Sequence, residues 1–433
     1  MGQQLLTLDD PAIGHCQSVL TQYLPGLDPG LTVLAPRQAL LAGSTLTALQ
    51  RAYGQAGTEA VLREAGVVAH RPASDRQALH RLLHRDLAAL PPRPALAAPL
   101  PDRLWHLGDV NVHAAWQHWG GPDTIAWGAV KVGQIDTGYT RHPALGFQGG
   151  QPWLEVAAGR TFFATGADGG SAGPGQGIDP LEMLWDGHGT RVASVICGHH
   201  AAAAGGPYLG VAPKVPLVPV RIANIVLISH AQRELAQALH YLVREAGVAV
   251  INLSMGFLPR TQMKVLDRAI DEAYEAGVIL VCAAGQPLAS VVSPAHGRRT
   301  VAVAGSTIGR IPWGKSAHGA AVDWSAPAAQ ILRGETQPSG QTGYAGGGDG
   351  TSYAAAISTG AAALWLARHG AALDTAYPQP WQRVEAFKAV AKTSANTMPH
   401  QQPGSFGAGV LDIGALLQKP LPAAASLRPE KPA

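Results

Sequence analysis

The chain has 433 residues, 46% of them hydrophobic, and a formal net charge of +3. It is long enough for two or three domains with a sizeable buried core. Basic and acidic residues are mixed along it, so nothing indicates a nucleic-acid partner. No stretch approaches the roughly 18 apolar residues that span a bilayer, so we expect no membrane partner. Residues 1–10 lack the basic region and apolar run of a secretory signal, which favours a cytoplasmic location.

The cysteines and histidines do not indicate a disulfide framework or a metal site. There are three scattered cysteines, and two of them, Cys197 and Cys282, fall in apolar segments where we expect buried, inert thiols. Spacings such as CxxC or HExxH are absent from the sequence. We therefore predict no cofactor and no metal ligands of these types.

Residues 1–98 form a separate region in front of a proline-rich segment. The run 31–34 is predicted as a strand, while Ser44 and Asp75 are suited to cap two helices whose leucines recur at helical spacing. Five prolines in residues 91–101 exclude a helix there and mark a linker. The pattern predicts a small α+β domain before the main one.

The first candidate catalytic residue, Asp136, follows an apolar run at residues 130–135. That run is rich in β-branched residues and predicts a strand buried in a parallel sheet. Catalytic groups gather at the carboxyl ends of such strands, where Asp136 would lie. Asp-Thr-Gly is also good turn chemistry, so a purely structural turn is the alternative. Asp-Thr-Gly is also the aspartic-protease signature, but that chemistry needs two aspartates that share a proton, and the sequence has only one Asp-Thr-Gly motif.

A glycine-rich insertion at residues 166–177 predicts a mobile surface loop, and the second candidate, His188, follows it. His188 stands between Gly187 and Gly189, and the apolar residues 192–196 after it predict a buried helix. The flanking glycines allow other backbone to approach closely. A plain polar surface histidine is the alternative interpretation.

The third candidate, Ser352, follows a glycine-rich stretch at residues 346–350 and Thr351. The small residues 354–367 after it predict a central, closely packed helix with Ser352 at its start. A serine there is often only a helix cap. In a catalytic role, the free N–H groups and dipole of this helix end would stabilise developing negative charge.

The order Asp136, His188, Ser352, each in its local context, resembles the subtilisin-like serine proteases, or subtilases. The resemblance covers about residues 102–417, including these further segments: 105–107, 112–116, 252–256, 281–285, 301–305, 322–327 and 407–412. It implies an α/β, three-layer fold with a mostly parallel seven-stranded sheet between helices. The domains would be 1–98, a catalytic domain at 99–418, and a tail at 419–433 predicted as disordered from its composition.

The resemblance also implies a mechanism, hydrolysis of peptide bonds through an acyl-enzyme. Ser352 would be the nucleophile, His188 the general base and then acid, and Asp136 the group that orients the imidazole. The backbone N–H of Ser352 would supply one oxyanion donor, and Gln286 stands where the family carries the asparagine that supplies the other.

The implied substrate site is an edge strand with a pocket beside it. Ser254 and Gly256, with Met255 between them, would pair through backbone with an extended peptide. The residues 254–256 and the segment Ala283, Ala284 and Gly285 would form pocket walls. These are mostly small residues, which favours an open primary pocket.

Gln286 is the main departure from the family pattern. Its amide is one methylene longer than asparagine's but is still a donor, so we expect partial oxyanion function and a slower enzyme. The alternative is a catalytically weak or inactive subtilase fold kept for binding or regulation. A peptide ligase of the same fold is a third possibility, with no positive support in the sequence.

The resemblance further implies that residues 1–98 are a prodomain, a folding aid and an intramolecular inhibitor cleaved between about residues 90 and 103. An unrelated helical interaction module is the alternative. Subtilases also often bind calcium, for which Asp168, Asp179 and Glu182 are candidates. Their spacing fits no known calcium loop, and solvated loop carboxylates are the favoured interpretation.

Overall fold

The structure of the protein is a computed structural model. The residues that the structure describes are 4–8, 32–35, 38–41, 58, 62, 67–72, 103–149, 152–162, 177–181, 186–199, 208–228, 231–257, 262–287, 289–399 and 401–432. The chain divides into two compact units, one mostly of residues 1–100 and the other mostly of residues 101–433. The predicted linker at 91–101, residues 166–176 of the insertion, and the helices predicted from Ser44 and Asp75 lie outside the described residues.

The described part of the first unit is an antiparallel sheet in the order β2-β3-β1-β4. Its strands are β1 (Gln4–Leu8), β2 (Thr32–Ala35), β3 (Gln38–Leu41) and β4 (Val67–Pro72). The strand predicted at 31–34 corresponds to β2. Thr58 and Leu62 are helical and buried, so the described residues of this unit combine helix and strand.

The second unit is built on one sheet in the order β11-β10-β9-β8-β5-β7-β6, with β12 paired to β10. All pairs are parallel except β10 with β11. The strands are β5 (Val132–Asp136), β6 (Arg160–Thr161), β7 (Leu217–Arg221), β8 (Val250–Leu253), β9 (Ile279–Ala283), β10 (Val301–Thr307), β11 (Ile311–Pro312) and β12 (Trp324–Pro327). The predicted mostly parallel α/β fold is confirmed. The sheet of the described residues has eight strands where seven were expected: six strands of four or more residues and two strands, β6 and β11, of two residues each.

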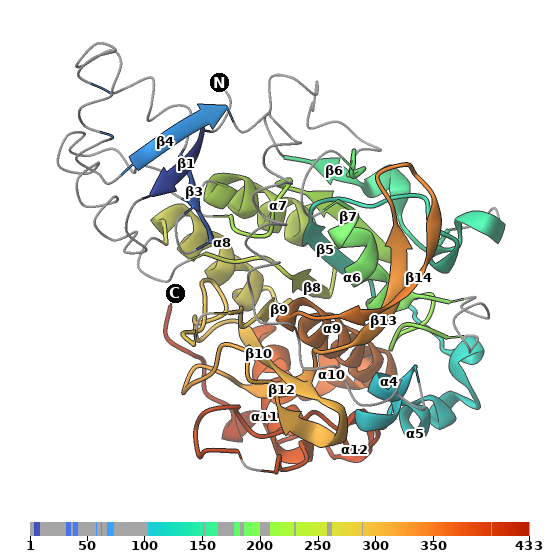
Figure 1. The fold of residues 1–433 in the computed structure, drawn as a ribbon. Helices are drawn as coiled ribbons and strands as arrows, with labels where there is room; N and C mark the ends of the chain where they lie inside the picture. The colour runs from blue at the N-terminus through green and yellow to red at the C-terminus, as the bar shows by residue number, and fades with distance from the viewer. Residues whose placement is uncertain are drawn as a thin grey trace. The chain divides into compact units, whose positions relative to one another are not determined.

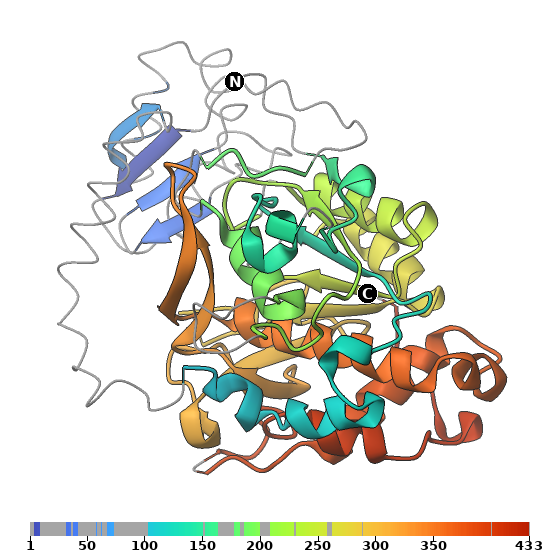
Figure 2. The ribbon, with the colours of Figure 1, turned by 90° about the vertical axis from the view of Figure 1, so that its right-hand side faces the viewer.

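Helices cover both faces of this sheet (Figures 1 and 2). Neighbouring residues of β5 show the two faces: a side chain at Gly133 would meet Leu242 of α7, while the amide of Gln134 donates to Gly189 O of α6. The helices are α4 (Trp105–Asp109), α5 (Val112–Trp116), α6 (His188–Cys197), α7 (Gln232–Arg244), α8 (Lys264–Glu275), α9 (Thr351–His369), α10 (Ala371–Ala376), α11 (Trp381–Ser394) and α12 (Ile413–Gln418). Both faces being covered explains why the central strands are almost wholly apolar.

Helix α9 is the predicted small-residue helix, and it is buried from Thr351 to Leu366. It packs against α6 and against β8, β9, β10 and β12. A side chain at Gly360 would come within 2.9 Å of Val211, so its lack of a side chain permits this close approach. A hairpin of β13 (Ile331–Thr336) and β14 (Thr342–Gly348) leads into α9 and contacts α6.

The prediction that the tail is disordered is wrong for residues 419–432. Arg299 donates twice to the carbonyl oxygen of Glu430, and the Glu430 N–H donates to the Tyr274 hydroxyl at 2.9 Å. Leu427 is buried. Composition alone favoured disorder, but backbone groups of the tail find fixed partners on the second unit, which the sequence pattern does not reveal.

Candidate active site

Asp136 is the last residue of β5 and is 1% exposed. The strand ends there because the chain turns: Gly138 has a φ of 106°, a conformation that favours glycine. The N–H of Thr137 donates to Asp136 Oδ1 at 2.7 Å. The predicted strand therefore delivers its carboxylate to the carboxyl edge of the sheet.

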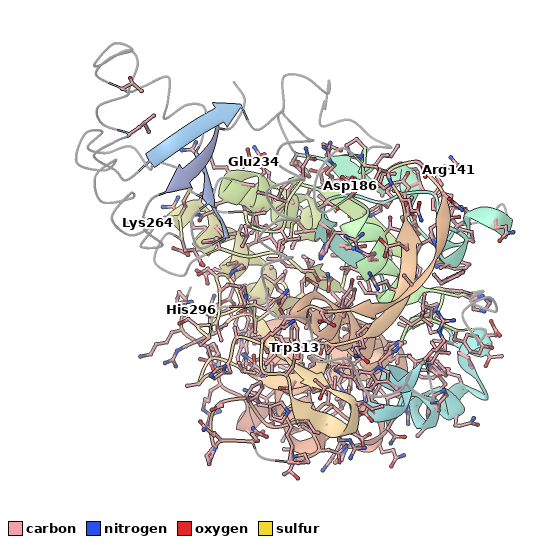
Figure 3. The ribbon with its side chains drawn as sticks, viewed as in Figure 1. Arg141, Asp186, Glu234, Lys264, His296 and Trp313 are labelled. Carbon is pink, nitrogen blue, oxygen red and sulfur yellow. The ribbon has the colours of Figure 1, made fainter. Side chains whose placement is uncertain are left out.

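His188 is the first residue of α6, as predicted from the helix after it. Asp186, labelled in Figure 3, lies on the turn just before this helix. A Cβ at Gly189 would lie 2.0 Å from Gly138 O, so glycine is required where the two motifs meet. The flanking glycines thus have the predicted role of allowing close backbone approach.

Asp136, His188 and Ser352 form one hydrogen-bonded chain. His188 Nδ1 lies 2.7 Å from Asp136 Oδ1, and His188 Nε2 lies 3.2 Å from Ser352 Oγ. His188 and Ser352 are each 7% exposed, which leaves little water to compete for these bonds. Asp136 Oδ2 is buried and has no hydrogen-bond partner within the described part of the chain. The arrangement places the Asp136 carboxylate, an acceptor, at one ring nitrogen of His188 and the Ser352 hydroxyl at the other.

Ser352 is the second residue of α9, and its side chain does not cap the helix. Its Oγ also lies 3.3 Å from Ser254 O, and Ser254 Oγ donates to Ser352 O at 3.1 Å. Asn252 on β8 donates to Ser254 Oγ at 3.0 Å. Ser254 therefore contacts the candidate nucleophile through both its backbone and its side chain, a contact that the sequence did not predict.

Gln286 is anchored through its oxygen, which defines the orientation of its amide. Its Oε1 accepts hydrogen bonds from the Thr351 N–H at 3.0 Å and from Thr351 Oγ1 at 2.6 Å. The Thr351 hydroxyl in turn accepts from the Gly285 N–H at 3.0 Å. Nε2 lies beside Gly350, 3.3 Å from where a Cβ would stand. The amide N–H groups therefore face the glycine before the Thr351–Ser352 pair. Sequence reasoning missed Thr351, because nothing in the motif shows which atom its hydroxyl binds.

The predicted substrate-binding edge differs from the structure at Gly256. Its N–H, expected to be offered to a peptide, donates instead to Val226 O at 3.0 Å. Met255 is 2% exposed, and Ala283 and Ala284 are also buried. Both backbone groups of Ala284 are paired with protein, to Val303 O and to the Val292 N–H. The chain's own segment around Val226 thus occupies a hydrogen bond that an extended peptide would need at this edge.

The remaining candidate residues are the cysteines and the three carboxylates considered for calcium. Burial raises the pKa of the Cys197 and Cys282 thiols well above their usual range, in keeping with the predicted inert role. Asp168 and Glu182 are not described. Asp179 is, and it accepts hydrogen bonds from protein groups. Within the described ranges no three His, Cys, Asp or Glu side chains gather as around a metal, and no described helix is long and apolar enough to cross a membrane.

Comparison with known proteins agrees with this geometry. A sequence profile of the subtilase family matches residues 128–409. Subtilisin Savinase of Lederbergia lenta is 31% identical over 236 residues, which are 54% of this chain and 75% of that protein. The major intracellular serine protease of Bacillus subtilis (strain 168) is 30% identical over 242 residues, 54% of this chain and 67% of that protein. The chain belongs to the subtilase family, and it is a subtilisin-like serine endopeptidase.

Solved structures show the same fold at lower identity. A protease from Pseudoalteromonas arctica PAMC 21717 has a TM-score of 0.58 at 22% identity and covers 73% of this chain and 96% of its own. MycP1 from the ESX-1 type VII secretion system has a TM-score of 0.56 at 22% identity, covering 77% and 90%. These likenesses concern the fold.

Proposed function

We propose that Asp136, His188 and Ser352 are the catalytic triad of an endopeptidase that works through an acyl-enzyme. The supporting observation is the single hydrogen-bonded chain from Asp136 Oδ1 through both ring nitrogens of His188 to Ser352 Oγ. The sequence order of these residues is the one known for subtilisin. Each group has the chemistry that its position requires: acceptor, base and nucleophile.

In the acylation step, Ser352 Oγ attacks the scissile carbonyl carbon while His188 Nε2 takes the hydroxyl proton. Asp136 Oδ1 accepts the Nδ1–H and stabilises the imidazolium that forms. The C–N bond then breaks, and His188 returns the proton to the leaving amine. Water attacks the resulting ester with His188 again as base, which frees the acid product and restores the Ser352 hydroxyl.

The oxyanion of each tetrahedral intermediate needs donors on one side of Ser352. We assign them to the Ser352 N–H, at the start of α9 where helical N–H groups have no intrahelical partner, and to Gln286 Nε2. The anchoring of Oε1 by Thr351 supports this assignment because it leaves the amide N–H groups unbound by that residue. This favours activity over the alternative of a catalytically inactive binding protein.

The substrate is a peptide or protein, and we propose that it adds as an extended strand beside Ser254, Met255 and Gly256. Pairing at Gly256 requires its hydrogen bond to Val226 O to open first. A primary pocket lined by Ala283, Ala284 and Gly285 remains a proposal, as do the inhibitory role of residues 1–98 and a cytoplasmic location. The absence of a required cofactor or calcium ion likewise stays a prediction.

The test is intact-mass spectrometry after treatment with a fluorophosphonate probe. Wild-type protein should gain one adduct, and Ser352→Ala should gain none. Ser358→Ala is the matched control, because Ser358 lies on the same helix, is fully buried and bonds to Trp324. No adduct on the wild type would favour the inactive alternative. Loss of residues before the 90–103 segment in wild type, but not in Ser352→Ala, would support a self-cleaved prodomain.

A further inference from the structure

One buried carboxylate outside the triad, that of Asp179, forms hydrogen bonds with the chain beside Asp136 and with the chain beside His188. Asp179 is 6% exposed. Its Oδ2 accepts a hydrogen bond from Thr137 Oγ1 at 2.8 Å and another from the Gly187 N–H at 2.9 Å. Thr137 follows Asp136, and Gly187 precedes His188. A single oxygen atom therefore joins the residue after the acid to the residue before the base.

The Thr137 hydroxyl extends this link to the other side of His188. Its oxygen accepts from the Gly189 N–H at 3.2 Å while its proton is donated to Asp179. A hydroxyl has one proton and two lone pairs, so both bonds can form together. The backbone N–H groups on both sides of His188 are thus tied, directly or through Thr137, to the Asp179 carboxylate.

Asp179 is itself held in place. Its Oδ1 accepts from the Leu181 N–H at 2.9 Å, and its backbone N–H donates to Tyr139 O at 2.8 Å. Burial raises the pKa of the Asp179 carboxyl, while the three donated hydrogen bonds and the nearby charge of Arg221 oppose that rise. Among the described residues the hydrogen bonds to the Asp179 side chain come from three donors, a pattern that suits an ionised carboxylate.

The link matters because the Asp136 to His188 contact joins two separate elements. Asp136 ends β5 and His188 begins α6, and Asp179 lies on the stretch of chain between them. Displacing catalytic groups by about 1 Å can cost about 100-fold in rate. We propose that Asp179 is a positioning residue, whose carboxylate locks the Asp136 turn to the start of the His188 helix. This rests on the triad proposed above.

The experiment compares variants that remove each bond of the link. Asp179→Asn keeps the shape but replaces one acceptor oxygen with a donor, so one tied N–H or O–H group loses its partner. Thr137→Val removes the hydroxyl at nearly constant volume, and Thr137→Ser keeps it. The measurements are kcat, KM, melting temperature and the low-field proton resonance of His188 Nδ1–H, assigned by its absence in His188→Gln.

We expect Asp179→Asn and Thr137→Val each to lower kcat by about 10- to 100-fold, with KM within about threefold, because the defect lies in aligning the base and not in binding. Their effects should not add in the double variant, because both break one network. Thr137→Ser should stay within about threefold of wild type. The low-field resonance should move or broaden in the first two variants and be unchanged in Thr137→Ser.

Asp323→Asn is the matched control, because Asp323 is also buried, accepts a backbone N–H, from Ala302, and makes its ion pairs with Lys388 and Lys392. It should lower the melting temperature and leave kcat and the resonance unchanged. An equal loss of kcat in Asp323→Asn would overturn the proposal, as would folded Asp179→Asn and Thr137→Val proteins with wild-type kcat and resonance.

The experiment still decides the role of Asp179 if one variant does not fold or if the wild-type protein is inactive. If Asp179→Asn does not fold, the Thr137→Val and Thr137→Ser pair decides by itself, and equal impairment of both would overturn the role of the hydroxyl link. If the wild type shows no labelling that depends on Ser352, the proposed function fails. The resonance requires only the Asp136 to His188 bond, and it then tests the positioning role without activity.

Discussion

Replacing Gln286 by glutamate tests the oxyanion assignment most directly, because this change removes the N–H donors and keeps the anchor. An oxygen remains where Oε1 accepts from the Thr351 N–H at 3.0 Å and from the Thr351 hydroxyl at 2.6 Å. The second position, now Nε2, becomes an oxygen without protons. Any change in rate is then due to the lost donor and the added charge.

The expected fall in kcat for Gln286→Glu depends on replacing an N–H donor beside the oxyanion with a charged oxygen. Loss of one such donor costs about 10²–10³ in kcat, a figure that comes from a subtilisin, a relative of this chain. The glutamate charge adds repulsion of the developing anion, so we expect a fall of at least about 10³, or about 4 kcal/mol. KM should change by less than about threefold, because the oxyanion exists only after attack on the carbonyl.

Gln286→Asn gives the complementary result. The side chain is shorter by one carbon–carbon bond, about 1.5 Å, which takes its oxygen out of hydrogen-bond reach of Thr351 unless the backbone moves. We expect kcat/KM to fall by about tenfold, although asparagine is the residue that the family pattern carries. The reason is that Thr351 would no longer hold the oxygen of the shorter side chain, so its amide N–H groups would not be held toward the oxyanion.

The assay is initial-rate kinetics on a chromogenic peptide, with active enzyme counted by fluorophosphonate titration and folding checked by melting temperature. A Gln286→Glu protein within threefold of wild type would refute the assignment of Nε2 as an oxyanion donor. A Gln286→Asn protein with kcat/KM more than tenfold above wild type would refute the anchoring argument and show that the longer side chain limits the enzyme.

Three other outcomes follow. The Gly256 amide proton, bonded to Val226 O at 3.0 Å, should be protected from exchange in free protein and lose that partner when a peptide aldehyde binds; single-step binding with no change at residues 222–228 would contradict this. Burial, together with the nearby Arg368 and His118, lowers the pKa of His369 from 6.5 to about 4. Between pH 6.5 and about 4 the unfolded chain binds a proton at His369 that the folded chain does not, so the free energy of unfolding falls as the pH drops through this range. His369→Gln should reduce that fall by about 1 kcal/mol in pH-dependent denaturation, since the half-buried ring is partly screened, and an unchanged slope would count against it. Deleting residues 420–433 removes the bonds of Glu430 to Arg299 and Tyr274 and should cost about 2 kcal/mol of unfolding free energy with kcat/KM unchanged; equal melting curves would show that the tail adds nothing.

The parts of the fold that the sequence predicted are those set by local pattern. The run at 130–135 is rich in β-branched apolar residues, and most of it lies in β5, a strand buried between helices. The small residues after Ser352 predicted a central helix, which is α9. Glycines on both sides of His188 predicted close backbone approach, and Gly189 meets Gly138 O. In each case neighbouring residues carry the information.

Partners distant in the chain were not predictable in the same way. Thr351 and Gln286 are 65 positions apart, and Asp179 lies 42 positions from Thr137. Which hydroxyl binds which oxygen depends on the packing of three loops at one sheet edge. The tail shows the same limit, because its composition favours disorder while its backbone binds Arg299 and Tyr274.

The sequence by itself indicated a buried strand before Asp136, the central helix and the three candidate catalytic side chains, because periodicity and glycine placement act over a few residues. The sheet as a whole was implied by the resemblance to the subtilases. Only the tertiary structure decided how these side chains are oriented. It placed Val226 O on the Gly256 N–H, where a free edge was predicted, and it turned the Gln286 oxygen toward Thr351. The physical reason is that a hydrogen bond is fixed by positions within a few tenths of an ångström, and those positions exist only after distant segments have packed.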